Sequence, residues 1–266
     1  MRLNEEVAIV TGSTTGIGYS IAKQLVKHGV AVVINGRNEE MVKATVLELQ
    51  ALGGNVVGLA KPVECFDTGD ELVKLAVKEF GKATILVNNA GMIADQMSYK
   101  MSDDAFSDVI DVHVKGTFFC TRPFVQQLKK QRIPGHIINM TSTAGLEGTI
   151  GQVNYSAAKA AINGMTWTLA KELQRDHIQV NAIAPAALTN MTRPYIEKAR
   201  RKAAESGTEL PSYWKIGSPD DVADFVIHLF KQENSEESGM IYGVNGTNIV
   251  RWHPPYSEPY SLNEHK

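Results

Sequence analysis

The stretch TGSTTGIG, residues 11–18, decides the fold of this chain. It follows an apolar, strand-like run that begins at Val7, and it leads into a helical pattern that begins at Ile17. Glycine permits a tight turn and a close backbone approach, and the first turn of a helix offers free N–H groups with partial positive charge. A strand, a glycine-rich loop and a helix in this order predict a site for the pyrophosphate of a dinucleotide. The alternative at this point is an ordinary tight turn.

Working outward from this loop, strands and helices alternate along the chain. Short β-branched runs predict strands at 7–11, 30–35, 56–60, 85–88, 136–140, 180–184 and 240–244. Helical patterns lie at about 17–28, 39–52, 68–80, 103–131, around YSAAK at 155–159, and at 219–230, where Ser218 is the expected N-cap. Repeated strand–helix–strand units predict an α/β fold, a doubly wound parallel sheet with helices on both faces.

The chain reads as one domain over 1–250, without a linker or an internal repeat. The remainder, RWHPPYSEPYSLNEHK at 251–266, carries prolines and aromatics that exclude a helix or a central strand. It is either a loose end or a strap over another surface.

Composition places the chain in the ordinary globular class. Its 266 residues are 43% hydrophobic and 21% charged, with a formal net charge of -2. This balance argues against binding to nucleic acid or to an anionic membrane, since both favour an excess of Lys and Arg. Cys65 and Cys120 suggest neither a disulfide framework nor a metal site, and no signal peptide or membrane span is recognisable, so the cytoplasm is the expected compartment.

Further motifs follow the glycine loop in a fixed order. They are NNAG at 88–91, Ser142 thirteen residues before Tyr155, YSAAK at 155–159 and NAIAP at 181–185. Together with TGSTTGIG they cover nearly the whole chain, and they resemble the short-chain dehydrogenase/reductase (SDR) family. The resemblance implies a Rossmann-type domain, a nicotinamide cofactor and alcohol/ketone chemistry, with a small-molecule substrate that the motifs do not name.

Tyr155 and Lys159 lie one helical turn apart, so their side chains share one face. A free tyrosine has a pKa near 10 and needs a stabilised anion to act at neutral pH. The Lys159 cation, with an oxidised nicotinamide, is expected to lower the pKa of Tyr155, which then serves as general acid in reduction and general base in oxidation. Ser142 is expected to donate a hydrogen bond to the same substrate oxygen. Taken singly, Tyr155 is an ordinary half-buried aromatic and Ser142 an ordinary loop hydroxyl.

Cofactor contacts are expected along the glycine loop and the later motifs. Gly12 allows the turn, Gly16 the close approach and Gly18 the packing of helix on strand. As the resemblance implies, Lys159 holds the nicotinamide ribose and Thr189 contacts the nicotinamide amide. The full predicted set is Gly12, Thr14, Thr15, Gly16, Ile17, Gly18, Arg37, Val63, Asn89, Ala90, Gly91, Tyr155, Lys159, Pro185, Leu188 and Thr189.

The sequence departs from the family pattern at three positions. His113 stands where the family has an asparagine that organises a water linked to the lysine. A histidine can still donate and accept, so His113 either keeps this catalytic relay with an altered pH dependence or merely packs. Pro62 replaces an aspartate that contacts adenine, leaving Val63 as the expected contact, and Ala186 replaces a glycine.

The end of the second predicted strand should select the cofactor. Asn35, Gly36 and Arg37 include no carboxylate that would hold a ribose 2′-hydroxyl, and Arg37 can pair with a 2′-phosphate. NADP(H) is therefore favoured and NAD(H) remains possible, because Arg37 can also be a solvated surface residue and the glycine loop carries Thr14 and Thr15 in place of a basic side chain.

Residues 188–214 fall where the family places a mobile substrate lid. The run KARRK at 198–202 either attracts an acidic substrate carrier or is a solvated helix face. An apolar cover for the substrate is expected from Met191, Tyr195, Ile196, Tyr213 and Trp214.

The resemblance also implies that apolar helices pair between subunits, giving a homotetramer or a homodimer; simple core packing is the alternative. The helices concerned carry Phe118, Phe119, Ala160, Ala161 and Met165.

The predicted function is reduction of a ketone, 3-oxoacyl reductase-like or as a general carbonyl reductase. The alternatives are an NAD-dependent hydroxyacyl or sugar-alcohol dehydrogenase, and a catalytically idle dinucleotide-binding sensor or scaffold.

Overall fold

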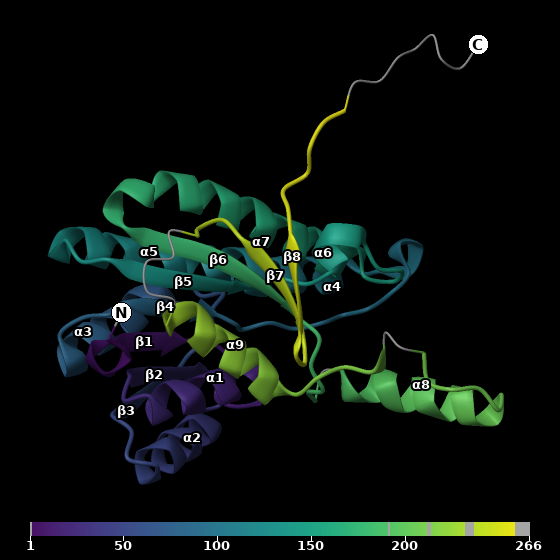
Figure 1. The fold of residues 1–266 in the computed structure, drawn as a ribbon, viewed down its shortest axis with the longest axis horizontal. Helices are drawn as coiled ribbons and strands as arrows, with labels where there is room; N and C mark the ends of the chain where they lie inside the picture. Colours follow the sequence, from purple (N-terminus) through teal and green to yellow (C-terminus); the bar gives the residue numbers. More distant parts are fainter. Residues whose placement is uncertain (1, 191, 212–213, 232–236, 259–266) are drawn as a thin grey trace.

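The protein, as seen in a computed structural model, is described here over residues 2–190, 192–211, 214–231 and 237–258. Within these residues eight strands form one sheet in the order β3-β2-β1-β4-β5-β6-β7-β8 (Figure 1). Neighbouring strands from β3 to β7 are parallel, and β8 is antiparallel to β7. The predicted doubly wound parallel sheet is confirmed.

The elements follow the predicted alternation closely. The strands are β1 Val7–Val10, β2 Ala31–Gly36, β3 Val56–Ala60, β4 Ile85–Asn88, β5 Gly135–Met140, β6 Ile178–Pro185, β7 Ile241–Asn245 and β8 Asn248–Trp252. The helices are α1 Gly16–Lys27, α2 Glu39–Ala51, α3 Thr68–Phe80, α4 Asp103–Ile110, α5 Gly116–Gln131, α6 Ala144–Glu147, α7 Val153–Glu172, α8 Arg193–Glu205 and α9 Pro219–Lys231.

The sheet is buried on both faces because successive side chains of each strand point to opposite sides. In β1, Ala8 and Val10 pack into a core formed with α1, α2 and α9. Val7 and Ile9 face the other side, where α3, α5 and α7 complete a second core. Figure 1 shows these two helical layers on opposite sides of the sheet. Because helices cover both faces of the sheet, the strands are apolar at successive positions and show no alternation with polar residues.

The order of the strands reverses direction between β1 and β4. Helices after these two strands leave toward opposite faces, so a crevice opens at their carboxyl ends. The glycine loop follows β1 and the NNAG stretch follows β4, which brings both motifs to this crevice. The fold therefore places the predicted binding residues at one edge of the sheet.

The predicted helix at 103–131 is interrupted by a feature that the sequence analysis did not expect. Its middle, Asp111–Lys115, is a π-helical turn between α4 and α5. Such turns are rare and occur frequently at functional sites, because the extra residue redirects a side chain. His113 lies in this turn. The predicted cap of the last helix is present, since the Asp221 N–H donates to Ser218 Oγ at 3.2 Å.

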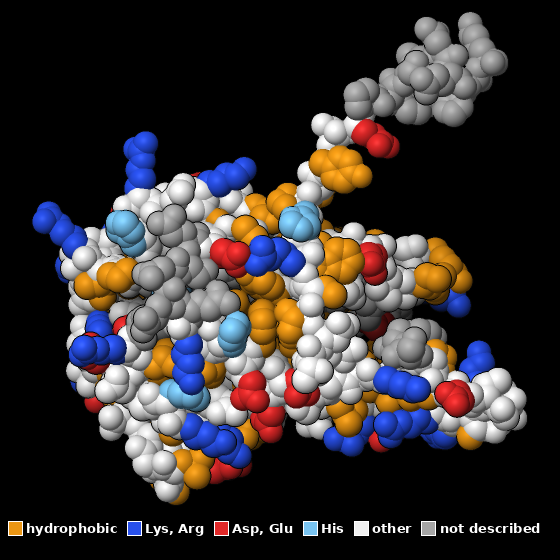
Figure 2. Space-filling view, viewed as in Figure 1, with side chains coloured by type: hydrophobic (Ala, Val, Ile, Leu, Met, Phe, Trp, Pro, Cys, Tyr) orange, Lys and Arg blue, Asp and Glu red, His pale blue; other side chains and the backbone are white. Residues whose placement is uncertain are grey.

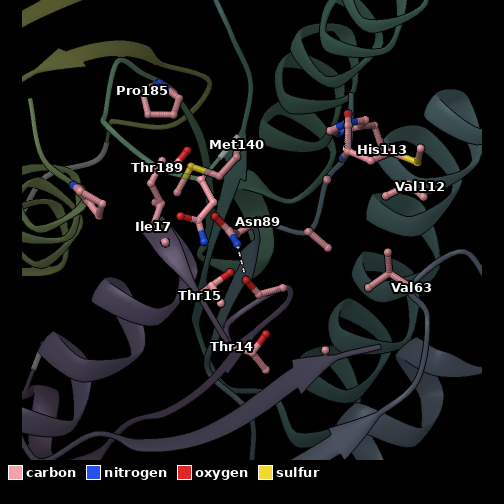
Figure 3. A pocket seen from close by; sticks show the side chains of 18 of the residues that line it. Thr14, Thr15, Ile17, Val63, Asn89, Val112, His113, Met140, Pro185 and Thr189 are labelled. Atoms are coloured by element: carbon pink, nitrogen blue, oxygen red, sulfur yellow. Dashed lines mark hydrogen bonds between the residues drawn. The ribbon is translucent and has the colours of Figure 1, made fainter. Parts of the chain in front are cut away.

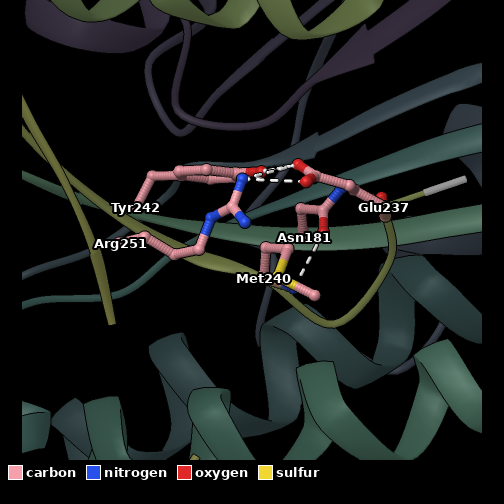
Figure 4. Close-up of polar contacts among 5 residues, drawn as sticks. All are labelled: Asn181, Glu237, Met240, Tyr242 and Arg251. Carbon is pink, nitrogen blue, oxygen red and sulfur yellow. Dashed lines mark hydrogen bonds and ion pairs between the residues drawn. The ribbon is translucent and has the colours of Figure 1, made fainter. Parts of the chain in front are cut away.

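Strand β8 was not predicted, and it takes up the first two residues of the expected tail. A polar cluster attaches this edge strand to the sheet (Figure 4). Arg251 donates to both carboxylate oxygens of Glu237 at 2.8 and 2.9 Å, and the Tyr242 hydroxyl donates to the same carboxylate at 2.7 Å. Residues 253–258 are exposed beyond the strand, which favours the loose-end interpretation for the described part of the tail (Figure 1).

No helix in the described ranges has the length and apolar character needed to cross a membrane.

Candidate active site

A cleft of about 440 Å³ opens at the carboxyl edge of the sheet (Figure 3). It gathers residues from the glycine loop, the strand ends, the π-helical turn, α7 and the segment before α8. The predicted residues that line it are Gly12, Thr14, Thr15, Gly16, Ile17, Arg37, Val63, Asn89, Ala90, Gly91, His113, Tyr155, Lys159, Pro185, Leu188 and Thr189. Two predicted residues, Gly18 and Ser142, are not part of this lining.

The glycine loop needs its first and third glycines for different reasons. Gly12 has φ +59°, and a Cβ there would lie 2.8 Å from Ala90 Cα. Gly18 is helical, and a Cβ on it would lie 2.5 Å from the carbonyl oxygen of Gly12 and 2.4 Å from Asn89 Nδ2. Any side chain at either position would push the loop away from the NNAG stretch. The loop is therefore closely packed on the stretch that follows β4.

Hydrogen bonds fix the two motifs to each other. Thr11 Oγ1 accepts from the backbone N–H groups of Asn89 and Ala90, each at 3.0 Å. Asn89 Nδ2 donates to the carbonyl oxygens of Thr11 and Gly12 at 2.9 and 3.0 Å. The side chain of Asn89 thus holds the backbone of the glycine loop at Thr11 and Gly12. Thr11 was not among the predicted site residues, although it is the threonine that begins the quoted stretch.

The end of β2 is built around a buried asparagine. Asn35 Nδ2 donates to the carbonyl oxygens of Leu59 and Lys61 at 3.2 and 2.9 Å. Its neighbour Arg37 is exposed, lines the cleft and has no ion-pair partner among the described residues. A second cation, Lys61, lines the same region, and its Nζ lies 2.7 Å from Asp67 and 2.8 Å from Glu71. The sequence analysis overlooked this lysine.

Pro62, the second departure from the family pattern, does not line the cleft. Its carbonyl oxygen accepts from Thr68 Oγ1 at 2.6 Å, which fixes the turn into α3. Val63 is buried against Gly116, where a Cβ would lie 2.7 Å from Val63 Cγ2. Val63 and Glu64 are therefore the residues that this segment presents to the cleft.

Helix α7 positions Tyr155 and Lys159. Lys159 is only 4% exposed, and its Nζ donates to the carbonyl oxygen of Met140 at 2.6 Å. The same Nζ lies 5.4 Å from the centroid of the Tyr155 ring. Burial lowers the pKa of Lys159 to about 7. The side chain is thus held by the end of β5, whose role as an acceptor was not predicted.

The predicted lowering of the Tyr155 pKa includes the charge of an oxidised nicotinamide, so it concerns the complex and stays a prediction. Burial raises the pKa of Tyr155 to about 12, while a hydrogen bond with Ser142 lowers it and the charge of Asp95 raises it. Ser142 is oriented by the Ala144 N–H, which donates to Ser142 Oγ at 3.2 Å. The phenol is therefore protonated in the dinucleotide-free protein, and burial makes it a weaker acid than free tyrosine.

The burial of Lys159 makes a prediction about stability. Its folded pKa of about 7 lies below that of the unfolded lysine, so the unfolded chain binds more protons between these two values. The free energy of unfolding of the dinucleotide-free protein should therefore rise with pH from about pH 7 to pH 8.5. In Lys159→Met this rise should be smaller. Thermal unfolding midpoints of both proteins across this range check it, and equal slopes would contradict it.

His113 is buried in the π-helical turn and packs edge-on against Tyr155, with ring centroids 5.3 Å apart. Its Nε2 lies 2.8 Å from the carbonyl oxygen and 3.1 Å from the nitrogen of Met92. Burial, with the charge of Lys159, lowers the pKa of His113 to about 3. A Cβ on Gly91 would lie 2.4 Å from His113 Cε1. Of the two roles considered, this geometry favours packing and support of the Met92 backbone.

The lid segment contains α8, whose bounds were not predicted, although a helix face was one interpretation of KARRK at 198–202. Of the expected apolar cover, Ile196 is buried, Tyr195 is 39% exposed and Trp214 is half-buried. Met191 and Tyr213 lie outside the described residues. The basic side chains at 198 and 200–202 are exposed, and Figure 2 shows Lys and Arg gathered over α8. They form a solvated helix face.

No group of three or more His, Cys, Asp or Glu side chains in the described parts of the chain is placed to hold a metal ion.

Comparison with known families matches residues 6–200 to the short chain dehydrogenases. The chain belongs to the short-chain dehydrogenase family. It is accordingly an NAD(P)-dependent oxidoreductase that acts on C=O or CH–OH groups. The resemblance stated from the motifs is confirmed.

Relatives match this short-chain dehydrogenase over nearly its whole length. The 3-oxoacyl-acyl-carrier-protein reductase of Thermotoga maritima is 34% identical over 250 residues, which are 94% of this chain and all of the relative. Subunit BbsD of a hydroxy(phenyl)methyl-succinyl-CoA dehydrogenase of Thauera aromatica is 35% identical over 246 residues, 92% of this chain and 97% of the relative. A crystal structure of a short chain dehydrogenase from Mycobacterium avium superposes with a TM-score of 0.85 at 32% identity, covering 100% of this chain and 91% of that one.

The residues of the cleft fit the dinucleotide that this family uses. A Cβ on Gly12 would point at Ala90. The side of Gly12 that faces the cleft is therefore its backbone. The N-terminus of α1 follows directly, where N–H groups favour a pyrophosphate. At the end of β2 the exposed cation is Arg37, and β2 itself ends without a carboxylate.

Proposed function

We propose that this short-chain dehydrogenase reduces the 3-oxo group of an acyl thioester to a secondary alcohol, with NADP(H) as cofactor. One observation carries the proposal: the hydroxyl of Tyr155, which lines the cleft together with the glycine loop, is paired with that of Ser142. A carbonyl oxygen that gains negative charge needs such a pair of donors.

In the proposed reaction each polar group has one task. The cofactor, when bound, supplies a hydride. Tyr155 Oη donates its proton to the substrate oxygen, and Ser142 Oγ donates a hydrogen bond to the same atom. Lys159 holds the nicotinamide ribose, and its pKa of about 7 allows it to carry or release a proton near neutral pH.

The remaining contacts would hold the rest of the dinucleotide. The glycine loop, with Gly12, Gly16 and Gly18, would face the pyrophosphate, and Thr189 the nicotinamide amide. Other proposed contacts are Thr14, Thr15, Ile17, Val63, Asn89, Ala90, Gly91, Pro185 and Leu188. The resulting path runs from Arg37 past the loop to Tyr155, all within one cleft.

The substrate class comes from the relatives' names. The Thermotoga maritima relative is named a 3-oxoacyl-acyl-carrier-protein reductase, and the Thauera aromatica relative a subunit of a hydroxy(phenyl)methyl-succinyl-CoA dehydrogenase. Both names describe an acyl thioester bearing an oxygen function. The exposed basic face of α8 is compatible with an acidic thioester carrier.

An assay of NADPH and NADH oxidation with ketones, diketones, sugars and 3-oxoacyl thioesters tests the proposed substrate. The thioesters should give the highest kcat/KM. If a sugar or an unactivated ketone gave a higher kcat/KM, that compound would replace the thioesters as the proposed substrate class.

Arg37 makes a prediction about cofactor choice. An exposed guanidinium without an acidic partner can pair with a 2′-phosphate through a charge-assisted hydrogen bond. Arg37→Ala should weaken NADPH binding by roughly tenfold and leave NADH binding within about twofold, because an exposed charged contact contributes on the order of 1 kcal/mol. Titration of nucleotide fluorescence measures both dissociation constants. Equal losses for the two nucleotides would remove Arg37 from cofactor selection.

A second candidate is the reverse reaction, oxidation of a hydroxyacyl thioester with NAD. The dehydrogenase name of the Thauera aromatica relative favours it, as do Thr14 and Thr15, which leave the glycine loop without a basic residue. Rates measured in both directions with both nucleotides would separate the two candidates.

We further propose a homotetramer, or a homodimer, through α5 and α7. Phe118 is 46% exposed and Ala160 is also exposed, so these helices retain uncovered apolar surface. A cytoplasmic location stays a prediction from the sequence.

A further inference from the structure

A single carboxylate joins the lid to the catalytic helix. Asp95 lies in the segment that follows the NNAG stretch, and its Oδ2 accepts two hydrogen bonds. One comes from Gln152 Nε2 at 2.8 Å and the other from the Tyr195 hydroxyl at 2.8 Å. Gln152 immediately precedes α7, and Tyr195 belongs to α8. Three segments that are far apart in the sequence therefore meet at one oxygen atom.

Asp95 is held firmly relative to Tyr155. The Gln96 N–H donates to the carbonyl oxygen of Gly151 at 2.8 Å. Asn154, which is fully buried, donates through Nδ2 to the carbonyl oxygen of Ala94 at 3.0 Å. Because Asn154 and Tyr155 are adjacent, the segment with Asp95 and the start of α7 form one unit. Asp95 is thus a fixed anchor beside the catalytic tyrosine.

Among the described residues, α8 has few other attachments. Helix α8 makes only sparse contacts with the other helices and strands, and Figure 1 shows it standing apart from the body of the molecule. Residues just before and within its first turn, including Thr189, Thr192 and Arg193, line the cleft. The position of α8 therefore decides how far one wall of the cleft is closed.

The environment of Asp95 makes its two hydrogen bonds important. Its other oxygen, Oδ1, is buried without a hydrogen-bond partner in the described parts of the chain. Asp95 as a whole is half-buried, and the two hydrogen bonds hold Oδ2 while Oδ1 is shielded from water. Loss of the Tyr195 hydroxyl would leave Gln152 as the remaining donor to the side chain. The carboxylate therefore favours the position of α8 in which Tyr195 reaches it.

We propose that Asp95 is a positioning residue for the lid: the Tyr195–Asp95 hydrogen bond holds the first turn of α8 at the wall of the cleft. The inference rests on the proposed function, because it assigns the closed lid to retention of the thioester substrate. Lid closure commits a substrate and excludes water from the reacting groups. The Tyr195–Asp95 hydrogen bond can thus affect substrate retention although neither residue contacts the reacting atoms.

The test uses Tyr195→Phe, which removes only the hydroxyl. The KM for a 3-oxoacyl thioester, acetoacetyl-CoA, should rise by roughly tenfold while kcat stays within about twofold, as expected for a lost hydrogen bond to a charged group. Limited trypsin digestion of the NADPH-bound protein provides a readout that needs no turnover. Cleavage at the exposed basic residues of α8 should be several-fold faster in the variant. The reason is that the cleavage rate follows the population of molecules in which α8 has left its position, and the lost hydrogen bond increases this population.

Tyr99→Phe is the matched control, because Tyr99 is 75% exposed and has no role in the cleft. It should match the wild type in both measurements. Asp95→Asn keeps the shape of the side chain but removes its charge, and it should accelerate cleavage in the same direction as Tyr195→Phe.

Wild-type rates of trypsin cleavage and an unchanged KM in Tyr195→Phe would overturn the inference. If the wild type reduces no 3-oxoacyl thioester, the proposed substrate is wrong, and the digestion of the NADPH-bound proteins alone decides the role of Asp95.

Discussion

Replacement of Tyr155 by phenylalanine should lower kcat by on the order of a hundredfold or more, because the substrate oxygen then loses its proton donor. The ring of Tyr155 packs against His113, and phenylalanine keeps this contact. The hydroxyl is the only group removed. The dissociation constant for NADPH should stay within about threefold, since the contacts of the glycine loop are untouched. Single-turnover rates with saturating nucleotide measure the chemical step directly.

Tyr256→Phe is a suitable control, because Tyr256 is 87% exposed in the tail. It should turn over at the wild-type rate. A Tyr155→Phe protein with near-normal turnover would remove the proton-transfer role from Tyr155, and Ser142 would become the next residue to examine.

The second large effect is expected at Gly12. Its φ of +59° disfavours a side chain, and a Cβ would lie 2.8 Å from Ala90 Cα. Left-handed strain and overpacking of this kind cost about 3 kcal/mol together, so Gly12→Ala should weaken dinucleotide binding by on the order of a hundredfold. The loop would have to leave the NNAG stretch and enter the space where the pyrophosphate would lie. Calorimetric titration with NADPH measures the loss.

Gly53→Ala separates the strain of the backbone from the clash. Gly53 also has a positive φ, +86°, but a Cβ there would meet nothing within 4 Å. This variant should lose some thermal stability and bind NADPH as tightly as the wild type. If Gly12→Ala, shown to be folded by circular dichroism, also binds NADPH normally, the glycine loop is not the pyrophosphate site.

Hydrophobic periodicity predicted the sheet because its strands are buried on both faces, as in the β-branched run of β2. Strand β8 was missed because the prolines that follow it suggested an irregular tail. A signal was nevertheless present: Asn245 and Gly246 form an Asn-Gly pair, a strong indication of a hairpin, and Gly246 has φ +57°. Helix α8 also carried a helix signature, with Pro194 in its first turn.

The residues of the site were predicted, but the orientations of their side chains and their hydrogen-bond partners were not. Spacing alone placed Tyr155 and Lys159 on one helical face, and both line the cleft. Lys159 donates to the backbone carbonyl of Met140, and a pattern of residue types in the sequence does not predict a backbone acceptor. The direction of the Tyr155 pKa shift is set mainly by burial, which spacing does not reveal. Asp95 was missed for a related reason, because its two partners, Gln152 and Tyr195, lie far from it in the sequence.

Transfer of deuterium tests the central claim most directly. NADPH labelled with deuterium at the transferable position of its ring is incubated with the wild-type protein and acetoacetyl-CoA, and the product is analysed by mass spectrometry. The account predicts a 3-hydroxyacyl product with one deuterium on the carbinol carbon, formed by the wild type and strongly reduced in Tyr155→Phe. Tight binding of NADPH with no labelled alcohol from this substrate or from any other carbonyl compound would show a sensor or scaffold, and would contradict the account.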